Sequence, residues 1–357
     1  MKYYIVEHFS GGERTAWNKA RLDAEKIAEK NGYKPIIVTG TALERVNTSL
    51  MNKIKAHISM GKIWEKTFSE LKAGDTVFIQ LPVVNNYLFL SNIFKKLRKR
   101  GVEIVVLVHD LEVLRLIKNP DFSFKRKIRM KTEELGALRE CSRIIVHNEK
   151  MQKFILSLGI NTPMTILGIF DYLISPSKTD ESLEELSKIR AKEKPDRVIV
   201  AGNLSEEKSG YIYKIPDKVK VELYGVNYKE NQKENLHYNG SFPADLLPYK
   251  LCNGFGLVWD GSSAETCEGV YGEYLRYNNP HKTSLYLASE VPVIIWKEAA
   301  LASFVEENGL GVTISSIEEI PQKLALITDD EYKEMFKKVT EISKKLRNGE
   351  YLKKALS

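Results

Sequence analysis

Short apolar runs alternate with longer amphipathic segments along this chain, and the alternation occurs twice. In the first half, the runs expected to form strands are residues 3–6, 34–39, 76–80, 103–108 and 142–147. Helical patterns at 17–31 and 88–100 lie between them, and they stop at Gly32 and Gly101, since glycine commonly ends a helix. Strands that alternate with helices predict a parallel, doubly wound α/β sheet.

A second alternating series follows a change in composition, where Ser-Pro-Ser precedes a charged helical pattern. Its expected strands are 196–200, 220–224, 254–259, 291–296 and 312–314. At 357 residues the chain also exceeds the length at which one hydrophobic core keeps growing. We therefore expect an N-terminal domain over 1–174, a linker over 175–195 and a C-terminal domain over 196–332. A helical segment over 333–357 is expected to return to the N-terminal domain.

Several enzyme classes are disfavoured by motifs that the sequence lacks. It contains no His-Glu-x-x-His, no Asp-x-Asp between apolar strands, no Gly-x-x-x-x-Gly-Lys-Ser/Thr and no complete Gly-x-Gly-x-x-Gly. These absences disfavour metal-dependent transfer, P-loop ATPases and nicotinamide enzymes. The cysteines Cys141, Cys252 and Cys267 show neither zinc nor disulfide spacing, so we expect them to be packing residues.

The expected location is the cytoplasm. The N-terminal residues lack the apolar core of a signal peptide, and no apolar run approaches about 18 residues. Basic residues are concentrated at 95–100 and 124–131. These runs form either a solvated helix surface or a surface that attracts anionic lipid headgroups or a pyrophosphate-linked lipid. Nucleic-acid binding is disfavoured, because no recognisable pattern of aromatic residues interrupts them.

Ligands of open α/β sheets bind at the carboxyl ends of the strands, so residues just after each strand are candidates for function. Gly202 and Asn203 end one strand, and a glycine there lets the backbone approach a phosphate, with Lys208 in the following loop. An ordinary turn explains this segment equally well. Tyr224 ends another strand and is suited either to stacking on a nucleobase or to packing in the core.

The most informative segment starts a helix with Asn-Asn-Pro and continues with His281, Lys282 and Thr283. The free N–H groups and the dipole of a helix N-terminus attract an anion, and Lys282 adds a full positive charge. Asn279 and Pro280 have a structural explanation as a cap and a helix start. A lysine at the positive end of a helix is locally unfavourable, which favours a functional role. Together these groups would hold a diphosphate leaving group without a metal.

In the first half, His109 and Asp110 follow a strand. Asp110 is a candidate general base towards an acceptor hydroxyl, with His109 as neighbour or alternate, and a helix N-cap is the other interpretation of Asp110. The candidates on the acceptor side are His8, Gly11, Gly12 and Glu13.

The segment 277–296, with the Gly-Phe-Gly-Leu-Val-Trp run at 254–259, resembles bacterial glycosyltransferases of the glucosyltransferase-3 and β-1,6-galactofuranosyltransferase type. The resemblance implies a GT-B fold, in which two Rossmann-like domains face a central cleft. It also implies metal-independent transfer, an acceptor on the N-terminal domain and a nucleoside-diphosphate sugar held by the C-terminal domain. By matching position, the residues implied to contact the donor are Gly202, Asn203, Tyr224 and Lys282. One departure is Glu290, where this group more often has glycine.

The predicted function is inverting transfer of a hexose, for which galactofuranose from UDP-galactofuranose is the first choice. The predicted donor site also includes Asn279, His281 and Thr283, and no metal or other cofactor is expected. The expected acceptor is a lipid-linked oligosaccharide of a capsule or O-antigen, met at the inner face of the membrane, and a homo-oligomer is compatible with the sequence. Alternatives are a UDP-glucose-dependent transferase that acts on a glycoprotein or glycan, a sugar-nucleotide epimerase and a non-catalytic nucleotide-sugar-binding scaffold.

Overall fold

The computed structural model describes residues 1–8, 16–40, 50–85, 87–117, 124–176, 182–230 and 233–357. The chain divides into two compact units. The first contains Met1–Glu13, Arg21–Leu167 and Leu352–Ser357, and the second contains Arg14–Ala20 and Gly168–Tyr351. No helix in the described ranges is long and apolar enough to cross a membrane.

The first unit is built on a six-stranded sheet with the order β2-β1-β3-β4-β5-β6, and neighbouring strands are parallel. The strands are β1 (Lys2–His8), β2 (Lys34–Thr39), β3 (Thr76–Leu81), β4 (Glu103–Val108), β5 (Arg143–Val146) and β6 (Met164–Ile166). β3 and β4 are buried almost throughout, as continuous apolar runs are when helices cover both faces of a sheet. The predicted doubly wound sheet is confirmed, with β6 as an additional edge strand.

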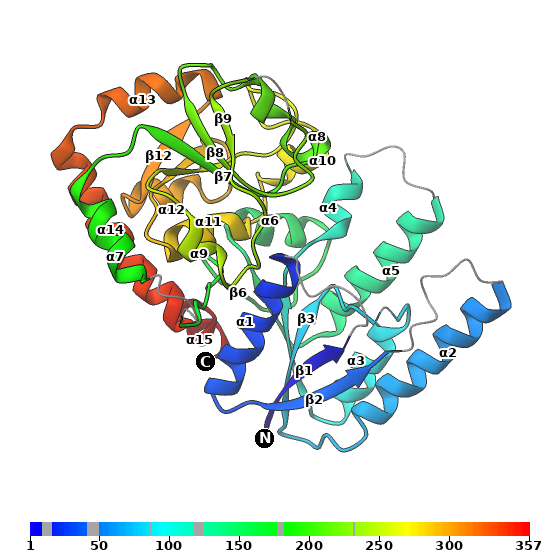
Figure 1. The fold of residues 1–357 in the computed structure, drawn as a ribbon. Coiled ribbons are helices and arrows are strands. Elements are labelled where there is room, and N and C mark those ends of the chain that lie inside the picture. Colours follow the sequence, from blue (N-terminus) through cyan, green and yellow to red (C-terminus); the bar gives the residue numbers. More distant parts are fainter. Residues whose placement is uncertain (9–15, 41–49, 86, 118–123, 177–181, 231–232) are drawn as a thin grey trace. The chain divides into compact units, whose positions relative to one another are not determined.

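Helices connect these strands. They are α1 (Ala16–Lys30), α2 (Leu50–Thr67), α3 (Leu90–Lys99), α4 (Glu112–Ile117), α5 (Phe124–Glu140) and α6 (Glu149–Ser157). The β1–β2 connection runs in the opposite direction along the sheet from the later connections. Because such crossovers are right-handed, α1 lies on one face of the sheet, whereas α2, α3 and α5 lie together on the other (Figure 1).

Basic residues of α3 and of its C-cap, Arg100, have partners that the sequence did not reveal. Lys96 Nζ lies 2.6 Å from Glu65 Oε1, and Arg98 Nη1 lies 4.0 Å from Glu140 Oε2. Arg100 Nη1 donates to Phe68 O at 3.1 Å, just beyond the C-terminus of α2. This basic run is therefore a partly neutralised surface that also supports local structure.

The second unit repeats the architecture with a six-stranded parallel sheet of order β12-β11-β10-β7-β8-β9. Its strands are β7 (Arg197–Asn203), β8 (Lys220–Val226), β9 (Leu236–Tyr238), β10 (Phe255–Val258), β11 (Val293–Trp296) and β12 (Gly311–Ile314). Its helices include α7 (Leu183–Lys192), α8 (Glu206–Ser209), α9 (Leu247–Lys250), α10 (Gly269–Tyr274), α11 (His281–Ala288), α12 (Ala302–Glu307), α13 (Ile320–Leu326) and α14 (Asp329–Asn348). The second predicted α/β domain is thus confirmed.

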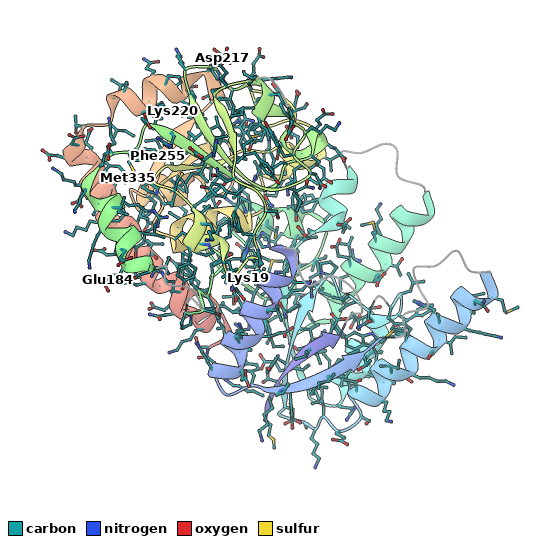
Figure 2. The ribbon with its side chains drawn as sticks, in the orientation of Figure 1. Lys19, Glu184, Asp217, Lys220, Phe255 and Met335 are labelled. Atoms are coloured by element: carbon teal, nitrogen blue, oxygen red, sulfur yellow. The ribbon has the colours of Figure 1, made fainter. Side chains whose placement is uncertain are left out.

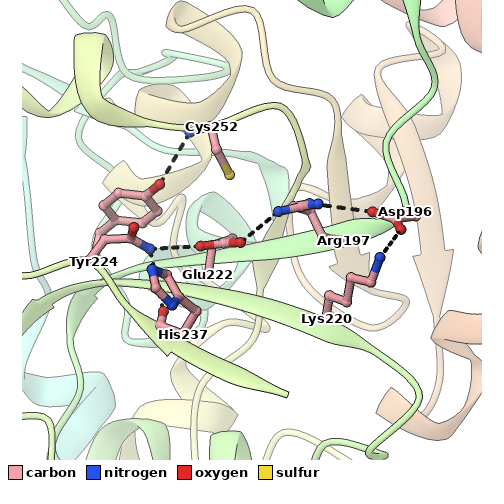
Figure 3. Close-up of polar contacts among 8 residues, drawn as sticks. Asp196, Arg197, Lys220, Glu222, Tyr224, His237 and Cys252 are labelled. Atoms are coloured by element: carbon pink, nitrogen blue, oxygen red, sulfur yellow. Dashed lines mark hydrogen bonds and ion pairs between the residues drawn. The ribbon is translucent and has the colours of Figure 1, made fainter. Parts of the chain in front are cut away.

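A polar network joins β7 and β8 at their amino-terminal halves (Figure 3). Arg197 Nη1 donates to Glu222 Oε1 at 2.8 Å, and Glu222 Oε2 accepts from Asn239 Nδ2 at 2.8 Å. Lys220 Nζ lies 2.5 Å from Asp196 Oδ2. The network ties the strands together at the end of the sheet opposite to the carboxyl ends, where ligands of such folds bind.

Helix α7 lies within the segment expected to be a linker, yet it belongs to the second unit. Its Arg190 is buried, and the guanidinium donates to Ser289 O and Leu251 O, both at 2.6 Å. The carbonyl of Arg190 accepts from Tyr332 Oη of α14 at 2.9 Å. The charged segment is therefore an integral helix of the second unit.

The chain ends in α15 (Glu350–Leu356), and its last residues belong to the first unit. Arg143 Nη1, at the start of β5, donates to Ala355 O at 2.6 Å. Leu352, Ala355 and Leu356 are buried. Of the segment expected to return to the first domain, Leu352–Ser357 belongs to the first unit, whereas α14 belongs to the second.

Candidate functional site

Lys282, the lysine singled out in the sequence, has an internal partner. Its Nζ lies 2.7 Å from Asp260 Oδ1 and donates to Trp259 O at 3.0 Å. The Lys282 and Asp260 side chains are only 12% and 7% exposed. This ion pair offsets the cost of a cation at a helix N-terminus, so the position of Lys282 also has a structural explanation. The pair also holds the ammonium at the carboxyl end of β10.

The first turn of α11 begins differently from the expectation. Pro280 is the N-cap rather than the first helical residue, and no side chain caps the helix. Asn279 is buried, and its Nδ2 donates to Gly168 O at 2.8 Å, so it anchors the turn to a neighbouring segment. Because the helix starts without a side-chain cap, its first N–H groups are suited to an external acceptor.

Three polar atoms around this turn are buried and have no hydrogen-bond partner among the described residues. They are Asn278 Oδ1, His281 Nε2 and Thr283 Oγ1. Thr283 is fully buried. Because buried polar groups are normally paired, each of these atoms is a candidate to contact a bound ligand or water. Thr283 and His281 therefore remain candidates beside Lys282.

His281 is held by stacking. Its ring centroid lies 5.0 Å from that of Tyr172, and Lys19 Nζ, labelled in Figure 2, lies 4.9 Å from the Tyr172 centroid. Burial, with the nearby Lys19 charge, lowers the pKa of His281 to about 4, although a hydrogen bond with the backbone of Asp171 opposes the shift. The imidazole is therefore neutral near pH 7 and adds no charge to the site.

The turn after β7 has the conformation that its glycine suggested. Gly202 and its partner Gly225 on β8 have φ values of 128° and 149°. A Cβ on Gly225 would lie 1.8 Å from Gly202 O, so the close approach of the two strands requires glycine at position 225. Asn203 is exposed, and its Oδ1 accepts from Ser205 N at 3.1 Å. Gly202 and Asn203 thus form the exposed carboxyl end of β7, where the chain turns towards α8.

Two other donor candidates differ in their surroundings. Lys208 lies in the short helix α8 that follows β7, with Nζ 5.6 Å from the ring centroid of Tyr271. Tyr224 is buried in the core, and its hydroxyl accepts from Cys252 N at 3.3 Å. In this structure, core packing is the role of Tyr224, because its ring has no face open to a nucleobase.

A residue that the sequence did not indicate joins α11 to the end of β7. Tyr286 is fully buried, and its hydroxyl accepts from Ala201 N at 2.8 Å. Gly256 on β10 makes room for the ring, since a Cβ there would lie 2.3 Å from Tyr286 Cγ. The glycine between apolar residues of the Gly-Phe-Gly-Leu run was the available signal. This contact sets the distance between α11 and the Gly202 turn.

In the first unit, His109 and Asp110 follow β4 as expected. His109 Nε2 lies 2.6 Å from Gln80 Oε1 of β3. Helix α4 begins two residues after Asp110, and Glu134 Oε1 and Oε2 accept from the N–H groups of Glu112 and Val113, both at 2.9 Å. Glu134 therefore accepts from the first N–H groups of α4, and burial raises the pKa of Glu134 to about 8.

A buried charge cluster lies beside Gln80, and sequence reasoning missed it. Glu7 on β1 accepts from Val84 N at 3.0 Å and Asn85 N at 2.8 Å. Arg21 Nη1 lies 3.9 Å from Glu7 Oε2. Burial raises the pKa of Glu7 and lowers that of Arg21.

Glu25 of α1 completes this cluster. Burial raises its pKa to about 7 against the opposing charge of Arg21. Gln80 Nε2 lies 3.5 Å from Glu25 Oε1. Arg21 and Glu25 lie one turn apart on α1, between apolar residues, which was the only signal in the sequence. The acceptor candidates Gly11, Gly12 and Glu13, and the side chain of His8, lie outside the described residues.

Comparison with known proteins places these features in a family. The glucosyltransferase 3-like N-terminal domain matches residues 2–169, and the glucosyltransferase 3-like C-terminal domain matches residues 198–357. The chain belongs to the glucosyltransferase 3-like family. It is 33% identical to beta-1,6-galactofuranosyltransferase WbbI of Escherichia coli K12, over 99% of this chain and 97% of that protein. It is 25% identical to glucosyltransferase 3 of Streptococcus gordonii, over 79% of this chain and 78% of that protein.

Solved structures show the same fold at low sequence identity. Sucrose-phosphate synthase of Thermosynechococcus elongatus superposes with a TM-score of 0.62 at 9% identity, covering 99% of this chain and 96% of that one. Trehalose-6-phosphate synthase OtsA gives 0.57 at 11% identity, covering 99% and 98%. The family and this fold identify the chain as a glycosyltransferase with two Rossmann-like domains of the GT-B type.

Proposed function

We propose that this glycosyltransferase transfers galactofuranose from UDP-galactofuranose to an oligosaccharide acceptor. The choice of donor sugar is supported by the 33% identity to a beta-1,6-galactofuranosyltransferase along almost the entire length of both chains. The observation that carries donor binding is the first turn of α11. There an uncapped helix N-terminus, the Lys282 ammonium and the unpartnered Thr283 hydroxyl occur together.

In this proposal, the second unit binds the diphosphate. Lys282, held by Asp260, neutralises charge that develops as UDP departs, while the N–H groups of the first turn and Thr283 donate to phosphate oxygens. The Gly202–Asn203 turn allows a close backbone approach. Because Lys282 and the helix terminus supply positive charge from the protein, the transfer needs no metal for this step.

The first unit would supply the base. Asp110 accepts the proton of the acceptor hydroxyl as the hydroxyl oxygen attacks the anomeric carbon. The bond between that carbon and the phosphate oxygen breaks, and UDP leaves with the electron pair, so the configuration inverts. His109, with its fixed partner Gln80, is the alternate base. The acceptor we propose is a lipid-linked oligosaccharide of a surface polysaccharide.

A second candidate donor is UDP-glucose, favoured by the glucosyltransferase 3 proteins among the relatives. Thermal-shift titration with UDP, GDP, dTDP and NAD in EDTA tests the nucleotide, since ligands of the native state stabilise it by mass action. Donor-hydrolysis assays with UDP-galactofuranose, UDP-galactopyranose and UDP-glucose then separate the sugars. Stabilisation by UDP in EDTA supports the proposal, whereas stabilisation by NAD alone, or by none of these ligands, contradicts it.

A further inference from the structure

Helix α2 of the first unit exposes large apolar side chains on one face. Met51, Ile54 and Ile58 are 62%, 48% and 56% exposed, and their spacing places them on adjacent turns of the helix. Phe89 is 50% exposed, and its ring centroid lies 6.0 Å from that of His57 on α2. We call these four side chains, Met51, Ile54, Ile58 and Phe89, the α2 face.

The α2 face is additional to the surface that α2 needs for folding. The opposite side of the helix already packs into the core, where Ala56, Met60 and Trp64 are buried. Single exposed apolar residues are common, but several on one helix face mark a surface that interacts with something else.

The charge around the α2 face indicates what that partner is. Residues 50–63 contain no acidic residue and three lysines. Lys55 and Lys62 are exposed beside the apolar side chains. An apolar face flanked by lysines is typical of helices that lie in the interface of an anionic bilayer. The net charge of +7 favours the same partner.

We propose that the α2 face docks on the surface of an anionic phospholipid bilayer. Met51, Ile54, Ile58 and Phe89 enter the headgroup region, and Lys55 and Lys62 lie near the lipid phosphates. The inference deepens the proposed function, since a membrane-bound enzyme meets a lipid-linked acceptor, and the nature of that acceptor rests on the proposed function. Docking itself depends only on residues of the first unit.

Vesicle flotation of the full chain tests the proposal. Vesicles of phosphatidylglycerol mixed with phosphatidylcholine are compared with vesicles of phosphatidylcholine alone. We expect binding to the anionic vesicles, and at least about tenfold weaker binding for the triple variant Met51→Gln, Ile54→Gln and Ile58→Gln. The matched control is Leu326→Gln, which removes a side chain that is 67% exposed in the second unit, and it should bind like the wild type.

A second variant separates charge from apolar contact. Lys55→Glu with Lys62→Glu leaves the apolar side chains in place and should weaken binding, with an effect that shrinks as salt is added. Each variant should keep the thermal stability and UDP response of the wild type, because every substituted residue is exposed.

Three results would overturn the proposal: no binding to anionic vesicles, undiminished binding by the triple variant, or a triple variant that instead dissociates an oligomer seen by light scattering. The last would assign the α2 face to contact between copies of this chain. Vesicle binding without sugar transfer would contradict the proposed function and leave docking intact. Transfer to a soluble acceptor without vesicle binding would contradict docking and leave sugar transfer intact.

Discussion

His109 Nε2 and Gln80 Oε1 lie 2.6 Å apart at the carboxyl ends of β4 and β3. The Gln80 amide nitrogen lies 3.4 Å from Arg21 O, a backbone carbonyl that can only accept, and 3.5 Å from Glu25 Oε1. The amide oxygen must therefore face His109 and accept its Nε2–H. In the neutral ring, the lone pair is then on Nδ1. Gln80 thus sets the tautomer of the histidine next to Asp110.

Without Gln80, the His109 ring should adopt both neutral tautomers. With the protein labelled with ¹⁵N at histidine, the wild type should show His109 as the Nε2–H form, and Gln80→Leu should show exchange between tautomers. We expect kcat to fall by about tenfold, with a smaller change in KM, because acid–base steps are sensitive to the protonation state of a neighbouring ring. The exposed Gln322→Leu is the matched control. An unchanged His109 signal in Gln80→Leu would contradict this assignment.

Two variants of the Lys282–Asp260 pair test whether Lys282 contacts the nucleotide. Lys282→Ala should weaken UDP binding by about tenfold or more, because it removes a charge-assisted contact to the diphosphate and leaves the buried Asp260 carboxylate unpaired. Isothermal titration with UDP measures this loss.

Lys282→Ala with Asp260→Ala is the control for folding damage. The double variant should regain thermal stability relative to Lys282→Ala, since no buried charge is left alone, but it should not regain UDP affinity. Recovery of affinity would show that Lys282 acts only through Asp260 and does not contact the nucleotide.

Glu290 follows α11 with a left-handed backbone, φ 59°, and its carboxylate pairs with Arg347 of α14. Glu290→Gly relieves strain of about 1 kcal/mol but removes the carboxylate that faces Arg347 and the buried Arg190. We expect a net loss of about 1–3 kcal/mol of unfolding free energy. Glu290→Gln keeps the strain and loses the charge, so it should be less stable than Glu290→Gly. A glycine variant more stable than the wild type would contradict this order.

The raised pKa of Glu25, about 7, makes stability depend on pH. Between its ordinary pKa of 4.5 and 7, the folded state binds more protons at Glu25 than the unfolded state does. The contribution of Glu25 to stability is therefore present below pH 4.5 and is lost as pH rises to 7, by up to about 3 kcal/mol.

Glu25→Gln tests this dependence. Tm for the variant minus Tm for the wild type should be more positive at pH 8 than at pH 5. Comparing the two pH values cancels the loss of the contact to Gln80, which is common to both. A difference that stays constant with pH would mean that Glu25 titrates normally in the folded protein.

The sequence predicted the core strands well because buried parallel strands are continuous apolar runs. It did not predict β6 and β9, which have three residues each and are half-exposed at the sheet edges. Candidate site residues could be predicted where their pattern lies within one continuous segment, as for Lys282. Partners distant in sequence were not predicted: the pairing of Asp260 with Lys282, and the cluster of Glu7, Arg21 and Glu25, depend on how strands and helices pack.

Tyr224 shows the limit of such patterns most clearly. An aromatic residue at the end of a strand fits both a base-stacking platform and a core position, and hydropathy alone does not separate the two. The structure buries the ring and occupies its hydroxyl with Cys252 N. Its place in the core depends on contacts from distant parts of the chain, such as the one from Cys252, which lies 28 residues later.

Neither unit is a single stretch of chain. The first includes Leu352–Ser357, and the second includes Arg14–Ala20. During synthesis, the first unit therefore lacks Leu352–Ser357, which includes the acceptor for Arg143, until that segment has left the ribosome. Domains usually fold in order from the N-terminus. Here the domain made first is finished last, so a prematurely terminated chain is defective in the part that was translated correctly.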